Sequence, residues 1–263
     1  MSLKFIDTHA HLTWKTFHGR IEEVVAKAEE AGVSVIIDIG TDLSNSIEAR
    51  ENAYRFKGVC FCAGIHPNDA ALAKDTDIKE IEELCRDPKC VAIGEIGLDF
   101  YREHTEPAVQ EKWLRLQLQL ALSLEKPIVL HDRNASQKLL KILEEENYDG
   151  NQAPGGVFHC FAGGKEMVHE VLKRGFYISF TGNLTYNKSD RGKVARTVPL
   201  DRLLLETDSP FMAPVPRRGK VNEPAYIPYI AAAHATGRNI SLDEVAEQTT
   251  SNANNLFKIN AII

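Results

Sequence analysis

The chain has 263 residues, of which 43% are hydrophobic and 26% are charged, as in ordinary globular proteins. We find no apolar run near the roughly 20 residues of a membrane span and no signal-peptide pattern, so we expect a cytoplasmic protein that does not bind membranes. The net charge of −6 argues against a broad basic surface for duplex nucleic acid, but it is compatible with a small phosphate-bearing ligand.

Short β-branched segments alternate with longer amphipathic segments along the chain. We predict strands at residues 4–8, 33–39, 59–65, 91–93, 128–130, 156–159, 176–180 and 203–206. We predict helices at residues 20–31, 44–56, 77–86, 106–124, 136–146, 165–174 and near 191–198, and a last helix over 241–257. Residues 212–228 are rich in proline and show no periodicity, so we predict a long ordered loop there.

This alternation predicts an α/β fold in which parallel strands are joined by helices. Eight repeats of the unit predict closure into a TIM-like (β/α)8 barrel, formed by one domain over residues 1–263. Barrels of this kind carry their active sites at the C-terminal ends of the strands. Polar residues at those ends are therefore the candidates for function.

The end of the first predicted strand carries two histidines, His9 and His11. Side chains alternate between the two faces of a strand, so these two imidazoles point to the same side. Neutral imidazole is the commonest protein ligand for zinc-like metals. The pair alone does not establish a metal site, which also requires ligands at the ends of other strands.

Other strand ends also carry histidines and carboxylates: His66, Glu95, His131, His159, Glu206 and Asp208. The remaining histidines fall in helices or loops, where we expect them to be solvated or structural: His18, His104, His169 and His234. Four imidazoles and two carboxylates are too many ligands for one catalytic zinc ion, which takes three protein ligands and a water. They suit two divalent ions (magnesium, manganese or zinc) about 3.5–4 Å apart.

We hypothesise that the first-strand pair and Asp208 bind one ion, and that His131 and His159 bind the other. Glu95 would bridge the ions, because a carboxylate offers two oxygens. Asp208 would also accept a proton from metal-bound water. Asp208 and Glu95 are therefore the predicted catalytic residues.

Three further polar residues near strand ends are candidates for the site. His66 either touches a substrate phosphate or makes a structural contact beneath the site. Glu206 either orients a metal-bound histidine or forms a buried ion pair with a lysine. Arg133 lies just past a ligand-bearing strand and would clamp a phosphate through parallel hydrogen bonds.

The sequence also carries a set of motifs in a fixed order, at residues 5–11, 64–67, 94–99, 131–133, 159–163, 205–210 and 218–224. Together they resemble the TatD-related metal-dependent hydrolases, best known as deoxyribonucleases, a branch of the amidohydrolase-like barrels. One departure is Arg217, which stands where many relatives carry histidine or another ring.

The resemblance implies hydrolysis of phosphodiester bonds in DNA by attack of metal-bound hydroxide. In the implied mechanism, the two cations and Arg133 or Arg218 would bind the substrate phosphate and stabilise the charge on its oxygens. We expect digestion of single-stranded DNA from an end, with DNA or an oligonucleotide as substrate and no obligate protein partner. Two alternatives remain open. One is a two-metal hydrolase of a small phosphoester, lactone or amide, and the other is a metal-binding scaffold without catalysis.

Overall fold

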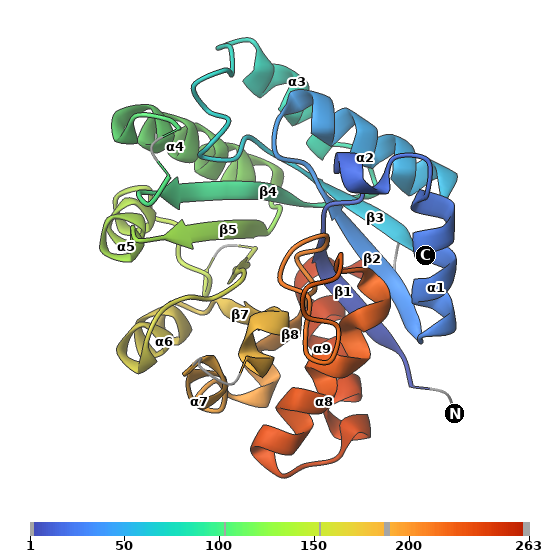
Figure 1. Cartoon of the computed structure of the whole chain (residues 1–263). Helices are drawn as coiled ribbons and strands as arrows, with labels where there is room; N and C mark the ends of the chain where they lie inside the picture. Colours follow the sequence, from blue (N-terminus) through green and yellow to red (C-terminus); the bar gives the residue numbers. More distant parts are fainter. Residues whose placement is uncertain (1–2, 103, 153, 187–189, 260–263) are drawn as a thin grey trace.

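The computed structural model describes the chain except residues 1–2, 103, 153, 187–189 and 260–263 (Figure 1). Eight parallel strands pair in chain order within one sheet. They are β1 (Phe5–Ala10), β2 (Val33–Ile39), β3 (Val59–Ala63), β4 (Cys90–Asp99), β5 (Ile128–Arg133), β6 (Gly156–Phe158), β7 (Tyr177–Phe180) and β8 (Leu203–Leu205). The helices are α1 (Ile21–Glu30), α2 (Leu43–Arg55), α3 (Asp77–Cys85), α4 (Pro107–Leu124), α5 (Ser136–Glu145), α6 (Lys165–Lys173), α7 (Arg191–Ala195), α8 (Ile227–Arg238) and α9 (Leu242–Phe257).

The first and last strands meet and nearly close the sheet. Ala10 forms an isolated parallel bridge with Ser209, just beyond β8. The backbone N–H of Asp208 donates to the carbonyl of His9 at 2.9 Å. The predicted TIM-like barrel is therefore confirmed, and its closure brings the His9 segment directly beside Asp208.

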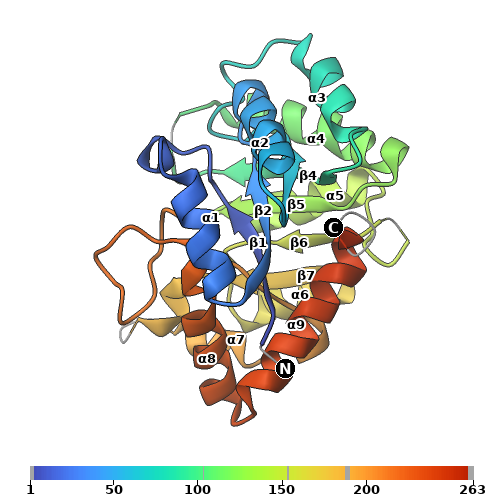
Figure 2. The same ribbon diagram turned by 90° about the vertical axis from the view of Figure 1, so that its right-hand side faces the viewer.

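The barrel interior is packed with side chains and closed at one end by α9. Every other residue of β2 and β3 (Val35, Ile37, Ile39, Cys60 and Cys62) belongs to one buried cluster with Leu256 and Phe257 of α9. The Asn252 amide of α9 donates to the carbonyls of Leu200 and Leu203, each at 2.8 Å, where β8 begins. Figure 2 shows α9 running beside β1. The N-terminal end of the barrel is therefore structural, and the opposite end is left for chemistry.

Several predicted elements differ in extent from the observed ones; β1 and β5, for example, run on to Ala10 and Arg133. Two of the corrections have a clear physical reason. β4 continues to Asp99 instead of ending at Ile93, so Glu95 lies inside the strand. The two glycines of this segment hide its strand pattern, but Gly97 is needed there: it has a φ of +145°, and a Cβ would lie 2.0 Å from the His131 carbonyl oxygen. Its missing side chain lets β4 approach β5 at the position of His131.

The other correction concerns the loop predicted over residues 212–228. A helix, α8, begins at Ile227 and runs to Arg238. Pro228 lies in the first turn, where the missing N–H costs nothing. α8 is apolar on several sides because it is packed between neighbours, and this weakens the helical periodicity of the sequence. None of the helices in the described residues is both long and apolar enough to cross a membrane.

Candidate metal centre

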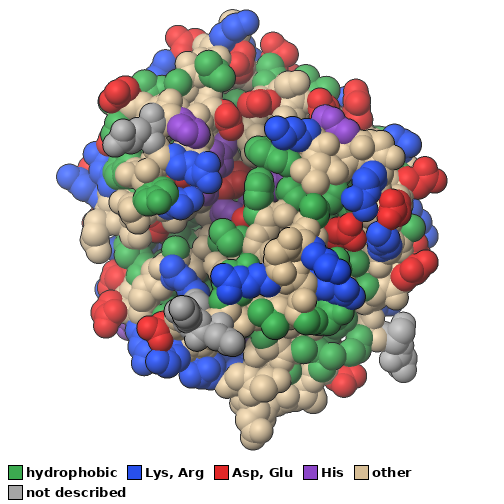
Figure 3. Space-filling view, viewed as in Figure 1, with side chains coloured by type: hydrophobic (Ala, Val, Ile, Leu, Met, Phe, Trp, Pro, Cys, Tyr) green, Lys and Arg blue, Asp and Glu red, His purple; other side chains and the backbone are tan. Residues whose placement is uncertain are grey.

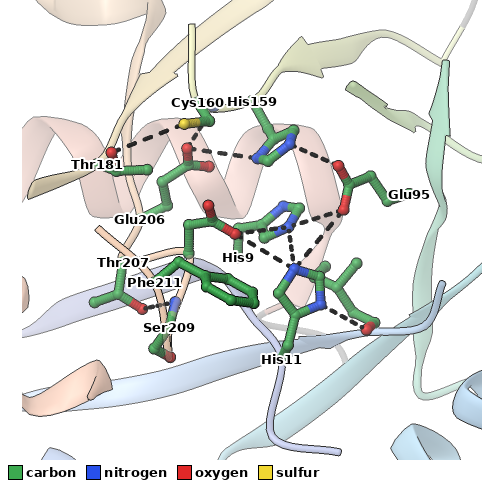
Figure 4. A network of polar contacts seen from close by, with 12 residues as sticks. His9, His11, Glu95, His159, Cys160, Thr181, Glu206, Thr207, Ser209 and Phe211 are labelled. Atoms are coloured by element: carbon green, nitrogen blue, oxygen red, sulfur yellow. Dashed lines mark hydrogen bonds and ion pairs between the residues drawn. The ribbon is translucent and has the colours of Figure 1, made fainter. Parts of the chain in front are cut away.

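The first-strand histidines converge as expected from their spacing. His9 is completely buried in β1, and His11 follows the strand at 5% exposure. Their Nε2 atoms lie 3.3 Å apart. Asp208 Oδ1 lies 3.3 Å from His11 Nε2 and 3.8 Å from His9 Nε2. The ligand atoms of these three side chains therefore lie within 3.8 Å of one another. Figure 4 shows the rings of His9 and His11 side by side.

Glu95 reaches from β4 into the middle of the histidines, and its two oxygens face different partners. Oε2 lies 3.3 Å from His9 Nε2 and 3.8 Å from His11 Nε2. Oε1 lies 2.7 Å from His159 Nε2 and 2.8 Å from His131 Nδ1. A carboxylate in this position can contact a cation on each side.

The donor set fits divalent metal ions. Three overlapping groups of side chains each bring ligand atoms within 4.8 Å of one another: His9, His159 and Asp208; His9, His11 and Glu95; His66, Glu95 and His131. Mixed imidazole and carboxylate donors suit zinc, manganese or iron better than magnesium. Burial, reinforced by nearby His159, lowers the pKa of His9 and favours its neutral form, which is the one that binds metal.

The charge of Glu95 is also set by its surroundings. Burial alone would raise its pKa, but the neighbouring histidines, His159 and His66 foremost, hold the pKa well below its usual value. Glu95 is therefore an ionised carboxylate at 3% exposure, surrounded by imidazoles. A buried anion requires compensating positive charge, and histidinium or a bound cation supplies it.

His66 lies inside this cluster. Its Nε2 is 3.5 Å from Glu95 Oε1, and its Nδ1 accepts the Asn68 N–H at 3.0 Å. The ring is 8% exposed and packs edge-on against His131, with centroids 4.5 Å apart. This position is compatible with binding a metal ion as well as with the predicted contact to substrate phosphate.

The partners of Glu206 bear on its two predicted roles. Its Oε1 accepts the Cys160 N–H at 2.5 Å and lies 3.7 Å from Nδ1 of His159, while Oε2 accepts the Ser179 hydroxyl at 2.7 Å. Within the described part of the chain, no lysine forms an ion pair with Glu206. The predicted ion pair with a lysine is therefore not observed in the described residues, and Oε1 lies close to the His159 ring without a hydrogen bond to Nδ1.

The two predicted phosphate-binding arginines each lie over a tyrosine ring. The Arg133 guanidinium carbon is 4.0 Å from the ring centroid of Tyr101, and that of Arg218 is 4.3 Å from the centroid of Tyr186. Figure 3 shows a hollow with histidine and acidic side chains at its base and lysine and arginine side chains around it. Basic side chains thus lie around the hollow although the chain carries a net charge of −6.

Comparisons with known proteins agree with this site. The profile of the family described as "TatD related DNase" matches residues 6–258. The chain belongs to this TatD family. It is 39% identical to "Uncharacterized metal-dependent hydrolase YabD" of Bacillus subtilis over 97% of this chain and 99% of that protein. It is 38% identical to "3'-5' ssDNA/RNA exonuclease TatD" of Klebsiella pneumoniae over 96% of this chain and 97% of that protein.

A solved structure is similar as well. YJJV of Escherichia coli K12, described as a TatD homologue, superposes with a TM-score of 0.91 at 30% identity, covering 98% of this chain and 99% of that one. The resemblance expected from the motifs is therefore confirmed, and the protein is a TatD-family metal-dependent hydrolase. The fold is confirmed independently by the closed sheet.

Two residues that support the TatD-family site were not singled out from the sequence. Asn222 is completely buried, and its amide donates to the carbonyls of Thr207 at 2.8 Å and Phe211 at 2.6 Å. Asp7 is also completely buried and accepts both the N–H and the hydroxyl of Thr207, at 2.9 and 2.5 Å. Both lie inside the motifs, but only the closed barrel shows that they tie β1 and the 212–222 loop to the end of β8.

Asp99 contacts the ring nitrogen of His131 that does not face Glu95. Its Oδ2 lies 3.2 Å from His131 Nε2, and its Oδ1 accepts the N–H groups of Tyr101 and Arg102 at 3.0 and 2.9 Å.

Three of the histidines expected outside the site are exposed, as predicted: His18, His104 and His169. His234 differs from them because it is buried at 3% exposure.

Proposed function

We propose that this TatD-family protein is a two-metal deoxyribonuclease that removes nucleotides from an end of single-stranded DNA. The observation that carries the proposal is the position of Glu95, whose two oxygens face separate sets of histidines. The nuclease named among its relatives supports the choice of substrate.

The side chains divide into two ligand sets around Glu95. His9, His11 and Asp208 would hold one ion, and His131 and His159 would hold the other, with His66 close to the second set. Bound divalent ions there would lower the pKa of water from 15.7 to about 7 and neutralise charge on the phosphoryl oxygens. Glu206 and Asp99 would fix the orientations of the His159 and His131 rings.

Asp208 is the residue that would accept a proton from the attacking water. Burial would raise its pKa, but the neighbouring His11, His9 and His159 hold it below its usual value. It is therefore ionised at neutral pH. Its Oδ1 lies among the ligand atoms of the first set, within reach of any molecule bound there.

Arg133 and Arg218 would stabilise the phosphate. Guanidinium groups bind phosphate oxygens through parallel hydrogen bonds, and stacking on tyrosine orients the guanidinium plane before substrate arrives. Arg133 is the last residue of β5, two residues after His131, and Arg218 lies in the loop that follows β8. They would supply the local positive charge that an acidic protein needs to bind a few nucleotides.

The proposal is tested with oligonucleotides labelled at the 5′ or the 3′ end, incubated with metal-free protein reconstituted with manganese, magnesium or zinc. We expect metal-dependent shortening of single strands from one end, and none with Glu95→Ala. Hydrolysis of a lactone, amide or small phosphoester by a preparation that leaves every oligonucleotide intact would overturn the substrate assignment. Metal binding without any turnover would overturn the enzymatic role.

A further inference from the structure

Two exposed aromatic side chains stand beside the candidate metal centre. Trp14 is 37% exposed and Phe211 is 41% exposed. Their rings meet edge to face with centroids 5.2 Å apart, and the His11 ring lies 6.4 Å from Trp14 and 6.3 Å from Phe211. Trp14 and Phe211 thus form an exposed apolar surface next to His11, one of the candidate metal ligands.

The backbone fixes both aromatic residues to members of the ligand cluster. The Trp14 N–H donates to the carbonyl of His11 at 3.1 Å, and the Phe211 N–H donates to the carbonyl of Asp208 at 2.8 Å. The buried Asn222 amide holds the Phe211 carbonyl from the other side. Figure 4 shows the Phe211 ring beside His11. The two rings are therefore positioned by the same segments that position the ligands.

These rings differ from the tyrosines near the two arginines. The faces of Tyr101 and Tyr186 are covered by the guanidinium groups of Arg133 and Arg218. Across the residues that the structure describes, no lysine or arginine lies over Trp14 or Phe211. In an edge-to-face pair, one ring presents only its edge to the other, so ring surface remains available to a flat ligand.

We infer that Trp14 and Phe211 form a stacking subsite for the base of the nucleotide next to the cleaved phosphate. The inference rests on the proposed nuclease function and adds to it the part of the substrate that the aromatic residues recognise. Every nucleobase has a flat π-face, so such a site binds bases with little sequence preference. A base in a duplex is paired and stacked and cannot lie on these rings, so the subsite selects unpaired ends.

Tryptophan fluorescence provides a test that does not depend on turnover. The chain has only two tryptophans, and the other, Trp113, is 2% exposed, so a ligand at the surface reports through Trp14. We expect a hydrolysis-resistant phosphorothioate oligothymidine to quench the fluorescence of the metal-loaded protein. Phe211→Ala should weaken this binding about tenfold. Trp14→Phe should remove the quenching but keep most of the affinity.

The same oligonucleotide with an abasic terminal residue is the matched ligand control. It keeps the phosphates and the sugar but offers no base, so it should bind without quenching. Equal quenching by the abasic ligand, or unchanged affinity in Phe211→Ala, would overturn the inference.

Cleavage kinetics give the second readout. Trp14→Ala and Phe211→Ala should raise KM for single-stranded DNA about tenfold and leave the kinetics on abasic-ended DNA close to wild type. Tyr54→Ala is the control variant, because Tyr54 is 56% exposed near the end of α2, which leads to the opposite end of the barrel. If the variants raised KM equally for normal and for abasic-ended DNA, the two rings would have a structural role and would not bind a base.

The two proposals fail in distinguishable ways. A wild-type protein that cleaves DNA but is unaffected by these variants retains its nuclease function without a stacking subsite. A wild-type protein that cleaves no DNA under any metal fails the proposed function, and the fluorescence measurement then shows separately whether a base binds these rings.

Discussion

Nε2 of His159 lies 2.7 Å from Oε1 of Glu95, and this contact joins the sixth strand of the barrel to the fourth. The strand between them, β5, contributes His131 to the same oxygen at 2.8 Å. The other oxygen of Glu95 faces β1. With His66, which follows β3, one carboxylate thus lies within 3.5 Å of imidazoles from the ends of four strands, and it is the side chain on which the proposed two-metal site most depends.

Replacing Glu95 by Gln should therefore impair metal binding as well as catalysis. The amide keeps the size of the side chain but loses the charge and one of the two metal-binding oxygens. Changes to residues that only orient ligands typically cost 10- to 100-fold, so we expect Glu95→Gln to lower kcat/KM more than about 100-fold. Elemental analysis after dialysis should also show less metal per chain. Full metal content together with full activity would contradict the bridging role.

Glu206→Gln tests the orientation of His159. Glutamine can still accept the Cys160 N–H and contact the Ser179 hydroxyl, so the fold should be retained. The lost charge should weaken metal affinity about 10- to 100-fold, measured by titration with manganese. Ser179→Ala, which removes only one hydrogen bond to Glu206, should have a smaller effect. Unchanged metal affinity in Glu206→Gln would leave the residue with a structural role alone.

Asn222→Ala should loosen the segment that carries Phe211 and Arg218. The substitution leaves the buried carbonyl of Thr207 and the part-buried carbonyl of Phe211 without this donor. The expected loss is about 1–3 kcal/mol in the free energy of unfolding, with a raised KM for DNA. Urea unfolding and steady-state kinetics measure both quantities. Asn151→Ala is the control, because the Asn151 amide donates to the Lys173 carbonyl at the exposed surface. An equal loss of unfolding free energy in Asn151→Ala would show that the buried position of Asn222 has no particular importance for stability.

His234 predicts a specific pH dependence of stability. Burial, and to a lesser extent Arg238, lowers its pKa from 6.5 to about 3. Below pH 6.5 the unfolded chain takes up a proton that the folded protein does not, so stability falls as the pH decreases from about 6.5 towards 3. Above about pH 6.5, His234 is neutral in both the folded and the unfolded chain, so it adds no pH dependence to the stability.

His234→Leu should remove this component. Between pH 7.5 and pH 5, the wild-type free energy of unfolding should fall by about 2 kcal/mol more than that of the variant. Urea unfolding of both proteins in chelator measures the difference, and the titration of the metal ligands cancels between them. Parallel pH profiles would show that His234 is not protonated preferentially in the unfolded chain.

Much of the candidate site could be predicted from the sequence, because a parallel barrel brings residues at the C-terminal ends of different strands close together in space. Once His9, His131 and His159 are placed at strand ends, a closed parallel barrel must bring them to one face. The same reasoning brings Asp208 to His11, since β8 closes against β1. Predicting that these residues lie close together requires only their positions along the strands, and no knowledge of their side-chain rotamers.

The remaining features depend on tertiary contacts that leave little trace in the sequence. Glu95 was expected beyond its strand but lies within it, because Gly97 lets β4 pack closely on β5. The role of Asn222 depends on the fold of a loop without periodicity, and α8 was missed because burial on several sides weakens its amphipathic pattern. Side-chain contacts such as that between Trp14 and Phe211 join loops from opposite ends of the chain.

The central claim is that two metal ions held around Glu95 cleave DNA, and the most direct test counts metal ions against nucleotide release. Metal-free protein is titrated with manganese while the release of nucleotides from an end-labelled single strand is followed and bound metal is measured. We predict that activity reaches its maximum only at two ions per chain. Full nuclease activity at one ion per chain, or no nucleotide release with two ions bound, would contradict the account.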